Sequence, residues 1–558
     1  MAEAGHHLLE VQDLAVEFQT AHGVVRAVRG ISFHLDRGET LAILGESGSG
    51  KSVSAAAIMN LIDSPPGFIT SGRITYQGTD LRALSGEERR QINGRKIAMI
   101  FQDPLAHLNP VYNVGWQIEE TLRAHGVGGR DARARTLELV RRVGIPDPER
   151  RLRDYPHQFS GGQRQRLMLA MALGLKPDIL IADEPTTALD VTVQAQILAL
   201  LEELQAETGM GLLLITHDLG VVAEVADRVA VMHDGVIVET GPVREIFRGA
   251  RHPYTQKLMA AVPGRGAISA GGPAAGDPLL RVEGLTKHYP ITSGLFRRST
   301  GEVVRAVEDA SFELMPGETL GIVGESGSGK STLARALLRL DEPTAGKAWF
   351  KGRDLFAMSA RELFRVRRRI QMVFQDPTAS LNPRMTIEQL IGEAWAIHPE
   401  ILPKRRRRDR IAELLELVGL QPGHARRFPH QLSGGQRQRV AIARALALEP
   451  ELVICDEAVS ALDVSIQAQV IELLKDLGRE LHLSYLFIAH DLPVVRDFAD
   501  RVLVMYRGRI VEAGTTAAIF ESPQHAYTQA LLAASPEPDP EVQAARRVER
   551  EAKLAAVG

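Results

Sequence analysis

Short apolar runs, each about the length of one strand, recur along the chain between longer mixed stretches. In the first half these runs are Leu41–Leu44, Ile97–Phe101, Ile179–Ala182 and Leu212–Ile215. Fully apolar runs of this length, separated by stretches long enough for a helix, are typical of buried strands joined by crossover helices. The pattern predicts an α/β fold with open sheets.

The pattern occurs twice. GETLAILGESGSGKS at Gly38–Ser52 returns as GETLGIVGESGSGKS at Gly317–Ser331, and SGGQRQR at Ser160 returns at Ser433. A repeat of this length is too long for the unit of a solenoid, so it indicates a duplicated domain.

Matching residues of the two copies lie at nearly constant offsets. Gly45 and Gly324 are 279 positions apart, whereas Ser160 and Ser433 are 273 apart. The difference in offset falls in the turn-rich stretch that covers Leu61–Gly78 in the first copy, where a surface insertion costs little.

A segment rich in Gly, Ala and Pro separates the copies. It covers Pro263–Pro278 and is typical of a flexible linker. We therefore expect a first domain over residues 1–262, a linker over 263–278 and a second domain over 279–558.

Composition narrows the functional classes. The net charge of −3 gives no overall attraction to nucleic acid, and the basic run Lys404–Arg408 is interpreted as a solvated surface. No apolar run approaches the roughly 18 residues that span a bilayer. The single cysteine, Cys455, precludes an internal disulfide and is interpreted as core packing.

Each copy contains a glycine-rich loop that matches GxxxxGK[ST], at Gly45–Ser52 and Gly324–Ser331, directly after an apolar run. Glycines let backbone N–H groups point at phosphate oxygens, and the following helix N-terminus favours negative charge. The alternative is an ordinary glycine-rich turn, which two copies in the same context disfavour. The predicted ligands are Lys51 and Lys330 for the terminal phosphates, and Ser52 and Ser331 for Mg²⁺.

Two adjacent acids follow an apolar run in each copy: Asp183 and Glu184, then Asp456 and Glu457. Alone, such a pair is more often the start of a helix. At the carboxyl end of a parallel strand, however, it would lie beside the phosphate loop. We predict that the first acid of each pair serves Mg²⁺ and that the second is the general base for water.

Polar residues end two further apolar runs of each copy. His217 and His490 could hydrogen-bond a γ-phosphate or the general base, although a lone histidine at a strand end is more often only a satisfied polar group. Gln102 and Gln375 could bind Mg²⁺ or the attacking water, a weak signal when taken alone.

The stretches FSGGQ, with Ser160–Gln163, and LSGGQ, with Ser433–Gln436, resemble the signature motif of ATP-binding-cassette (ABC) ATPases. The resemblance extends over nearly the whole chain in two copies. It implies two P-loop NTPase domains in tandem, each with an antiparallel β subdomain and a helical subdomain. It also implies that ATP and Mg²⁺ bind two composite sites, each completed head-to-tail by the signature of the other half.

The resemblance assigns further residues. Phe18 and Tyr289 stand where an aromatic ring stacks on adenine, although a strand aromatic is more often core. Asp190 and Asp463, in the ALDV stretches that begin at Ala188 and Ala461, would link the two sites. The implied nucleotide-binding set is Phe18, Gly45, Glu46, Ser47, Gly48, Ser49, Gly50, Lys51, Ser52, Val53, Ser160, Gly161, Gly162, Gln163, Asp190, Tyr289, Gly324, Glu325, Ser326, Gly327, Ser328, Gly329, Lys330, Ser331, Thr332, Ser433, Gly434, Gly435, Gln436 and Asp463.

Within that family, the tails HPYTQKL at His252 and HAYTQAL at His525 are similar to those of peptide and nickel importer subunits. The stretch Asp456–Ile466 in a tandem chain is similar to glutathione-import ATPases. The resemblance implies docking on two membrane permeases at the cytoplasmic face of the inner membrane, served by an extracytoplasmic binding protein. The helical segments 103–159 and 376–432 would contact the permeases. With one cysteine, no iron–sulfur cluster is expected.

Two other classes remain. A tandem cassette protein acting on ribosomes would also lack membrane spans, but such relatives carry a long charged linker. An exporter ATPase is the other possibility. The transported substrate is left open among dipeptides, oligopeptides, glutathione and nickel chelates, with a mild preference for peptides.

Overall fold

The computed structural model describes residues 7–20, 23–186, 189–264, 276–293, 298–460 and 462–546. Most of the predicted linker (265–275) and the positions Ala188 and Ala461 lie outside this part. The chain divides into two compact units, one of Met1–Val262 with Pro536–Gly558 and one of Pro263–Ser535. Among the described residues, no helix combines the length and apolar character that a membrane crossing requires.

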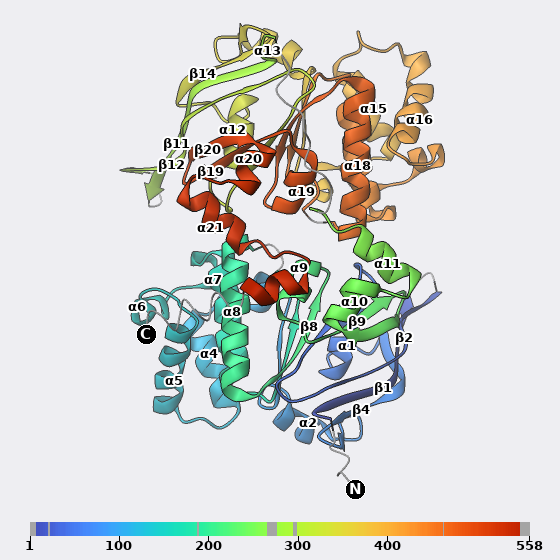
Figure 1. The fold of residues 1–558 in the computed structure, drawn as a ribbon, viewed down its shortest axis with the longest axis vertical. Coiled ribbons are helices and arrows are strands. Elements are labelled where there is room, and N and C mark those ends of the chain that lie inside the picture. The colour runs from blue at the N-terminus through green and yellow to red at the C-terminus, as the bar shows by residue number, and fades with distance from the viewer. Residues whose placement is uncertain are drawn as a thin grey trace. The chain divides into compact units, whose positions relative to one another are not determined.

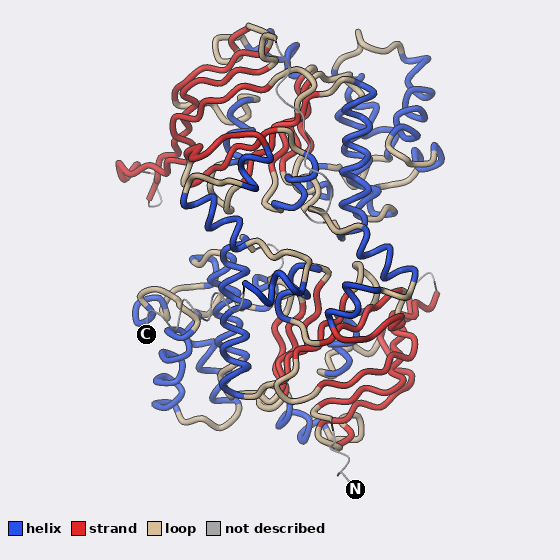
Figure 2. The backbone as a smooth tube through the Cα atoms, viewed as in Figure 1, coloured by secondary structure: helices blue, strands red, loops and turns tan. Residues whose placement is uncertain are grey.

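Unit 1 is built on a six-stranded sheet with the order β10-β9-β3-β8-β7-β6, parallel except for β10 (Figures 1 and 2). The strands are β3 (Thr40–Leu44), β6 (Ile97–Ile100), β7 (Ile179–Asp183), β8 (Gly211–Thr216), β9 (Arg228–His233) and β10 (Val236–Pro242). All four apolar runs of the first copy therefore form neighbouring strands of one sheet, as the pattern predicted.

A four-stranded antiparallel sheet with the order β2-β1-β4-β5 completes the β structure of unit 1. Its strands are β1 (Leu9–Thr20), β2 (Gly23–Leu35), β4 (Gly67–Tyr76) and β5 (Thr79–Asp80). The helices of the unit are α1 (Lys51–Ile58), α2 (Gly86–Ile92), α3 (Pro104–His107), α4 (Val114–Ala124), α5 (Gly129–Arg142), α6 (Pro148–Arg151), α7 (Gly161–Ala172), α8 (Val191–Thr208), α9 (Leu219–Val225), α10 (Val243–Gly249) and α11 (Pro253–Ala260).

The central sheet is apolar on both faces because each face supports a separate core. Along β7, Ile179 and Ile181 join a core shared with α1 and the antiparallel sheet. Their neighbours Leu180 and Ala182 join the core under α4, α5, α7 and α8. Successive side chains of a strand point to opposite faces, so a continuously apolar strand is required here. In Figure 1 the antiparallel strands and the helical subdomain accordingly lie on opposite sides of β8.

Unit 2 repeats this architecture, with a central sheet of order β16-β17-β18-β13-β19-β20 and an antiparallel sheet of order β12-β11-β14-β15. The strands are β11 (Leu280–Ser293), β12 (Arg298–Leu314), β13 (Thr319–Val323), β14 (Ala345–Phe350), β15 (Arg353–Asp354), β16 (Ile370–Val373), β17 (Leu452–Asp456), β18 (Ser484–Ile488), β19 (Arg501–Tyr506) and β20 (Arg509–Thr515). The helices are α12 (Lys330–Leu337), α13 (Ala360–Arg367), α14 (Pro377–Ser380), α15 (Ile387–Ile397), α16 (Arg407–Leu417), α17 (Gly434–Leu446), α18 (Val464–Leu481), α19 (Leu492–Phe498), α20 (Thr516–Glu521) and α21 (Ala526–Ala534). The predicted fold class is confirmed.

The C-terminal segment from Pro536 groups with unit 1 rather than with the unit that precedes it in sequence. The Pro536 carbonyl lies so close to Gly220, at the start of α9, that a Cβ there would be 2.8 Å from it. Farther along the segment, Glu541 forms an ion pair with Arg248 of α10. The sequence-based range 279–558 thus includes a segment that packs outside unit 2.

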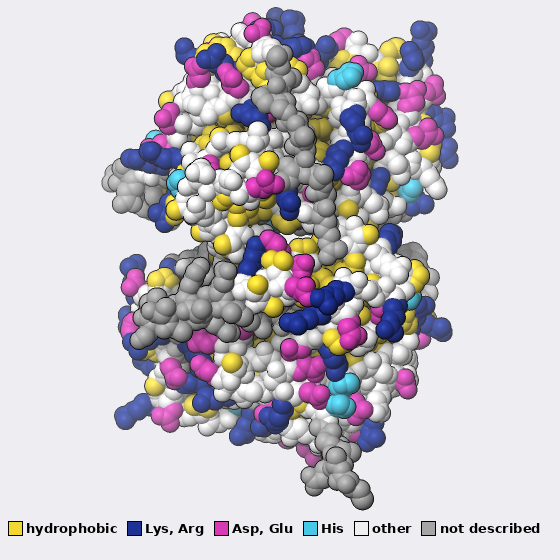
Figure 3. Space-filling view, viewed as in Figure 1, with side chains coloured by type: hydrophobic (Ala, Val, Ile, Leu, Met, Phe, Trp, Pro, Cys, Tyr) yellow, Lys and Arg dark blue, Asp and Glu magenta, His cyan; other side chains and the backbone are white. Residues whose placement is uncertain are grey.

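Cys455 lies in β17 and is fully buried in one of the two cores of unit 2. Burial, helped by the charge of Asp456, raises the pKa of its thiol to about 12. A neutral, enclosed thiol of this kind acts as a small apolar side chain. At the surface shown in Figure 3, Lys and Arg side chains are interspersed with Asp and Glu, in keeping with the net charge of −3.

Candidate functional site

The glycine-rich loop of unit 1 connects β3 to α1, and its glycines are required by their surroundings. A Cβ on Gly45 would lie 2.2 Å from the carbonyl oxygen of Met232. Gly50 has a φ of +102° and would bring a Cβ within 2.4 Å of the Ala27 carbonyl. In unit 2, Gly324 meets the Met505 carbonyl at the same 2.2 Å. The loops can therefore keep this shape only with glycine at these positions.

The loop lysines fold back onto their own loops. Lys51 Nζ donates to the carbonyl oxygens of Gly45 at 2.7 Å and Glu46 at 2.8 Å. Lys330 Nζ makes the equivalent bonds to Gly324, at 2.8 Å, and Glu325, at 2.9 Å. Both side chains are almost fully buried. Lys330 Nζ also lies 3.9 Å from a carboxylate oxygen of Glu457. An ammonium group bonded to carbonyls can exchange them for a phosphate, because a charged acceptor binds it more strongly.

The first acid of each pair contacts the loop serine. Ser52 Oγ donates to Asp183 Oδ1 at 2.9 Å, and Ser331 Oγ donates to Asp456 Oδ1 at 2.7 Å. Burial, together with the charge of Glu184, raises the pKa of Asp183 to about 6, and burial likewise raises the pKa of Asp456. A hydroxyl beside a destabilised carboxylate is an oxygen-only ligand set of the kind that Mg²⁺ prefers, so the residues present fit this ion.

The second acid of each pair is linked to both polar residues predicted around it. Glu184 accepts a hydrogen bond from Gln102 Nε2 at 2.7 Å, and His217 Nδ1 lies 3.1 Å from its other oxygen. The three side chains come from the ends of β6, β7 and β8, which are neighbours in the sheet. They could hold a water molecule between a base and two orienting groups.

The corresponding group in unit 2 is Gln375, Glu457 and His490. Gln375 Nε2 donates to Glu457 at 2.7 Å, and His490 Nδ1 lies 3.6 Å from the same carboxylate. Burial alone would lower the pKa of His490, but the hydrogen bond and charge of Glu457 raise it. For Glu457, burial alone would raise the pKa. The hydrogen bond and charge of His490 and the charge of Lys330 outweigh the effect of burial, so the pKa of Glu457 is lowered. The carboxylate is thereby kept in the form that accepts a proton.

Both glutamates have strained backbones. Their φ angles are +48° at Glu184 and +47° at Glu457, in the left-handed region that side chains larger than hydrogen disfavour. Each amide is held by the adjacent strand, with Glu184 N donating to the Ile215 carbonyl at 2.8 Å and Glu457 N to the Ile488 carbonyl at 2.9 Å. Strain of this kind persists where the surrounding structure imposes it, and it is concentrated at functional sites.

The two SGGQ stretches begin helices. Ser160 is the N-cap of α7 and accepts from Gln163 N at 3.3 Å, while the Gln163 side chain accepts from Ser160 N. Ser433 and Gln436 form the same reciprocal cap at the start of α17. Each cap uses the amides of its serine and its glutamine, and the N-terminus of a helix favours a bound anion.

The remaining predicted residues lie at element ends or on the antiparallel sheet. Asp190 and Asp463 are the N-cap residues of α8 and α18. Phe18, on β1, is half-buried against the core shared with α1. Tyr289, on β11, donates to Asp341 at 3.1 Å and has Lys287 Nζ 4.7 Å from its ring centre. One face of the Tyr289 ring is thus already occupied by a cation.

Two tyrosines that the sequence reasoning did not single out also contact the loops. Tyr254 on α11 accepts a hydrogen bond from Glu46 N at 3.3 Å, and Tyr527 on α21 accepts from Glu325 N at 3.1 Å. Their recurrence at the same position of both HxYTQ tails was a signal that could have pointed to them. In the sequence alone, the motif indicates the family but not a contact.

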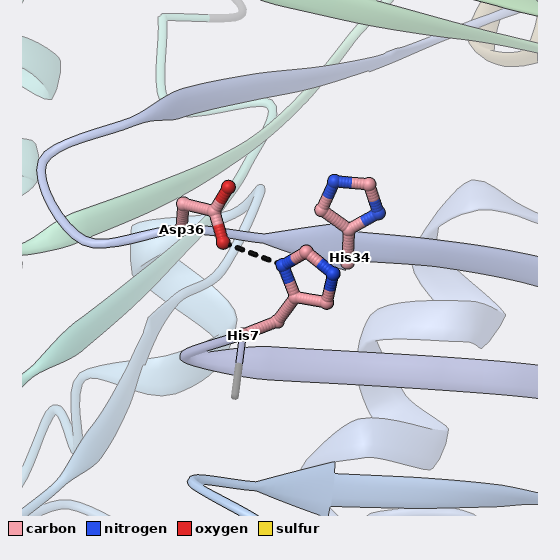
Figure 4. A group of neighbouring side chains, drawn as sticks. All are labelled: His7, His34 and Asp36. Carbon is pink, nitrogen blue, oxygen red and sulfur yellow. Dashed lines mark hydrogen bonds and ion pairs between the residues drawn. The ribbon is translucent and has the colours of Figure 1, made fainter. Parts of the chain in front are cut away.

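A separate cluster of His7, His34 and Asp36 has the composition of a metal site (Figure 4). His7 Nδ1 lies 2.7 Å from Asp36, and the two histidine rings stack with centres 3.9 Å apart. However, Arg228 Nη1 lies 2.6 Å from His34 Nε2. A guanidinium that occupies one ligand nitrogen repels a cation, so this cluster is better explained by packing and hydrogen bonding.

Comparison with protein families identifies the fold's relatives. The model of the ABC transporter family matches residues 28–187 and 307–460, which together make up more than half of the chain. The chain belongs to the ABC transporter family. Both ABC cassettes are followed by a match to the oligopeptide/dipeptide transporter C-terminal region, at residues 238–272 and 511–556. The chain is accordingly a transporter ATPase with two ABC cassettes.

Similar ABC proteins cover almost the whole chain. The glutathione import ATP-binding protein GsiA of Salmonella paratyphi A is 51% identical over 97% of this chain and 91% of that protein. The protein of the same name from Escherichia coli K12 is 50% identical over 98% of this chain and 92% of that protein. Among solved structures, a dimeric ATP-binding cassette bound to ADP and Pi is 30% identical over 42% of this chain and 98% of its own, with a TM-score of 0.38.

Proposed function

We propose that this ABC ATPase powers the import of small peptides, glutathione or a related peptide among them, through a pair of membrane permeases. The observation that carries the ATP-hydrolysing part of the proposal is the presence of a complete Gln–Glu–His group beside a phosphate loop in both cassettes. The full-length similarity to glutathione import proteins and the two importer-type tails support the direction and class of transport. A ribosome-associated or exporting ATPase is not favoured by these similarities.

In the proposed mechanism each site binds ATP with Mg²⁺. The loop amides and Lys51 or Lys330 would bind the phosphates, and Mg²⁺ would be held by Ser52 with Asp183, or by Ser331 with Asp456. When bound, the ion would supply charge neutralisation for the phosphates. The glutamate of each site takes the proton of the attacking water, and His217 or His490 holds that glutamate. Gln102 and Gln375 are assigned to Mg²⁺ or water binding. Phe18 and Tyr289 are assigned to the adenine rings.

Closure of the two cassettes around ATP couples hydrolysis to transport. We assign Ser160–Gln163 to the nucleotide of the second cassette and Ser433–Gln436 to that of the first. Asp190 and Asp463 would link the two sites. A nucleotide held by both halves stabilises the closed state, whereas ADP and phosphate release it. This difference in contacts drives the permeases between their two states.

The helical subdomain of the first cassette presents an exposed apolar strip that suits a permease. Leu105, Val111, Tyr112 and Trp116 are 55%, 74%, 44% and 40% exposed. The rings of Tyr112 and Trp116 stack with centres 4.1 Å apart, which keeps a flat apolar surface outward. Exposed apolar strips of this kind mark protein or membrane contacts. We therefore place the chain on the cytoplasmic face of the inner membrane, with an extracytoplasmic binding protein delivering the substrate to the permeases.

The first experiment is an affinity pull-down from detergent-solubilised native membranes, with partners identified by mass spectrometry. We expect two multi-span permeases to be recovered. Recovery of ribosomal proteins and no permease would overturn the transport proposal while leaving the ATP sites untouched.

The strip predicts where the permeases bind. The second copy carries Arg384 and Gln389 at the positions that correspond to Val111 and Trp116. Val111→Arg with Trp116→Gln should lower permease recovery by about tenfold or more, because exposed aromatic anchors dominate such contacts. The control is Leu481→Arg, a substitution at another exposed apolar residue, 42% exposed at the end of α18. Equal recovery with both variants would contradict the assignment of the strip.

A further inference from the structure

The importer-type tails place one tyrosine hydroxyl on each phosphate loop. Tyr254 Oη accepts from the amide of Glu46 at 3.3 Å, and Tyr527 Oη accepts from the amide of Glu325 at 3.1 Å. The two tyrosines are 273 residues apart in sequence, so the arrangement recurs in both copies of the duplicated domain.

The peptide unit contacted in this way is also held from its other side. The carbonyl of Gly45 and the amide of Glu46 belong to the same peptide bond, and they point in opposite directions. Lys51 Nζ donates to that carbonyl at 2.7 Å while Tyr254 accepts from the amide. In unit 2, Lys330 and Tyr527 hold the peptide between Gly324 and Glu325 in the same manner. Each loop thus begins with a peptide plane held at both ends.

The lysine–carbonyl bond and the tyrosine–amide bond respond differently when nucleotide binds. The lysine is the group assigned to the terminal phosphates, so it must exchange its carbonyl partners for phosphate oxygens. The tyrosine bonds the amide of Glu46 or Glu325 rather than the lysine, so it can keep its bond when the lysine moves. It is then the contact that preserves the orientation of this peptide while the lysine moves.

The tail is built to place that hydroxyl. His252 is the N-cap of α11, and its ring accepts from Tyr254 N at 3.2 Å. Glu239 on β10 accepts from the amides of Arg251 and His252 at 2.8 Å and 3.1 Å. Gln256 Nε2 donates back to the Ala250 carbonyl at 2.9 Å. These bonds fix the first turn of the helix against the edge of the central sheet.

The second tail uses the same bonds. His525 accepts from Tyr527 N at 3.1 Å, and Gln529 Nε2 donates to the Pro523 carbonyl at 3.0 Å. Glu512 on β20 accepts from the amides of Gln524 and His525 at 2.7 Å and 3.1 Å. The histidine, tyrosine and glutamine of the HxYTQ motif therefore each have a structural role, and Thr255 and Thr528 are almost fully buried beside the glutamates.

Stacking completes the placement of the tyrosine ring. Tyr254 lies on His233, at the end of β9, with ring centres 3.8 Å apart. Tyr527 lies on Tyr506, at the end of β19, with centres 4.1 Å apart. The residue that faces the ring differs between the copies, but the hydroxyl–amide bond is the same in both.

We propose that Tyr254 and Tyr527 are positioning residues for ATP binding, through which the C-terminal tail of each cassette keeps its phosphate loop in the phosphate-binding shape. This inference rests on the ATP sites assigned under the proposed function. It assigns the HxYTQ tail to the nucleotide site of its own cassette, independently of any transported substrate.

The test is steady-state hydrolysis by the full chain carrying Tyr254→Phe and Tyr527→Phe. Loss of one preorganising hydrogen bond per site should raise the KM for MgATP about 3- to 10-fold. It should leave kcat nearly unchanged, because the loop must be ordered equally in the ground state and the transition state. The dissociation constant of a fluorescent ATP analogue should rise by the same factor. The matched control is Tyr506→Phe, which removes a hydroxyl from the same ring stack without touching the loop bond.

Outcomes other than this one are decisive as well. A fall in kcat or folded yield at unchanged KM would show a merely structural role for the hydroxyls and overturn the proposal. An equal rise of KM in Tyr506→Phe would do the same. The double variant Lys51→Ala with Lys330→Ala tests the ATP sites separately from the role of the tyrosines. If these substitutions abolish analogue binding while the phenylalanine variant binds normally, the ATP sites stand and the tyrosine proposal fails.

Discussion

Replacing Glu184 and Glu457 together by glutamine should reduce ATP hydrolysis by about 100-fold or more while leaving ATP bound. Loss of a general base typically costs a factor of 10² to 10⁴. Glutamine keeps the size of the side chain and can still hydrogen-bond Gln102 and His217, so the pocket should stay intact. The chain should then accumulate in the closed, ATP-bound state, measured as ATP retained through gel filtration.

The single variants provide the control. Glu184→Gln and Glu457→Gln each leave one complete site, and the residual phosphate release of each reports whether the two sites turn over equally. Near-normal turnover in the double variant would refute the assignment of these residues as bases, whatever the single variants show.

Asp183→Asn should stabilise the nucleotide-free protein at pH 7.5 and at the same time abolish Mg²⁺-dependent hydrolysis. The folded-state pKa of Asp183, about 6, lies above its ordinary value of 3.8. Between about pH 4 and pH 6 the folded state therefore binds more protons than the unfolded state, and stability falls as the pH rises through this window. Above pH 6 the ionised Asp183 destabilises the folded state by its full amount, which is at most about 3 kcal/mol for a pKa shift of roughly two units.

Asparagine removes this cost and retains an oxygen acceptor for Ser52. The thermal midpoint of the unit should rise by several degrees at pH 7.5. The gain should be much smaller near pH 4 and should vanish only below about pH 3, where the wild-type carboxyl is protonated in both states. Asp131→Asn, at an exposed position in the first turn of α5, is the control and should change little at either pH. A gain of equal size at pH 4 and pH 7.5 would exclude the buried charge as its cause.

The opposition of stability and activity at Asp183 has a clear physical origin. A carboxylate buried beside Glu184 is poorly solvated until a cation arrives. The site therefore stores an unfavourable interaction that, in the proposed mechanism, binding of Mg²⁺ with nucleotide would relieve. Asp456 is similarly buried and accepts a hydrogen bond from the equivalent hydroxyl, that of Ser331, so we expect the same behaviour in the second cassette.

Much of each site could be predicted because local sequence and sheet topology coincide. Gln102, Glu184 and His217 each follow an apolar run, and parallel strands bring their carboxyl ends to one edge of a sheet. The glycine-rich loop was recognisable because only glycine tolerates the approach of the Met232 carbonyl. The duplication then supplied each observation twice, at a constant offset from Ser160 and Ser433 onward.

The sequence by itself determined the duplicated α/β fold, the two phosphate loops, the acid pairs and the family. Each of these depends on residues close in the chain or on one rule of strand order. Only the tertiary structure decided that Gln102 binds Glu184, that Pro536–Arg546 packs in unit 1 and that Tyr254 reaches the amide of Glu46. The last two join segments more than 200 residues apart, and their partners are a surface helix and a backbone group. The repeated tyrosine of the two tails marks a position of interest, but a backbone amide has no side-chain identity, so the sequence does not indicate that this amide is its partner.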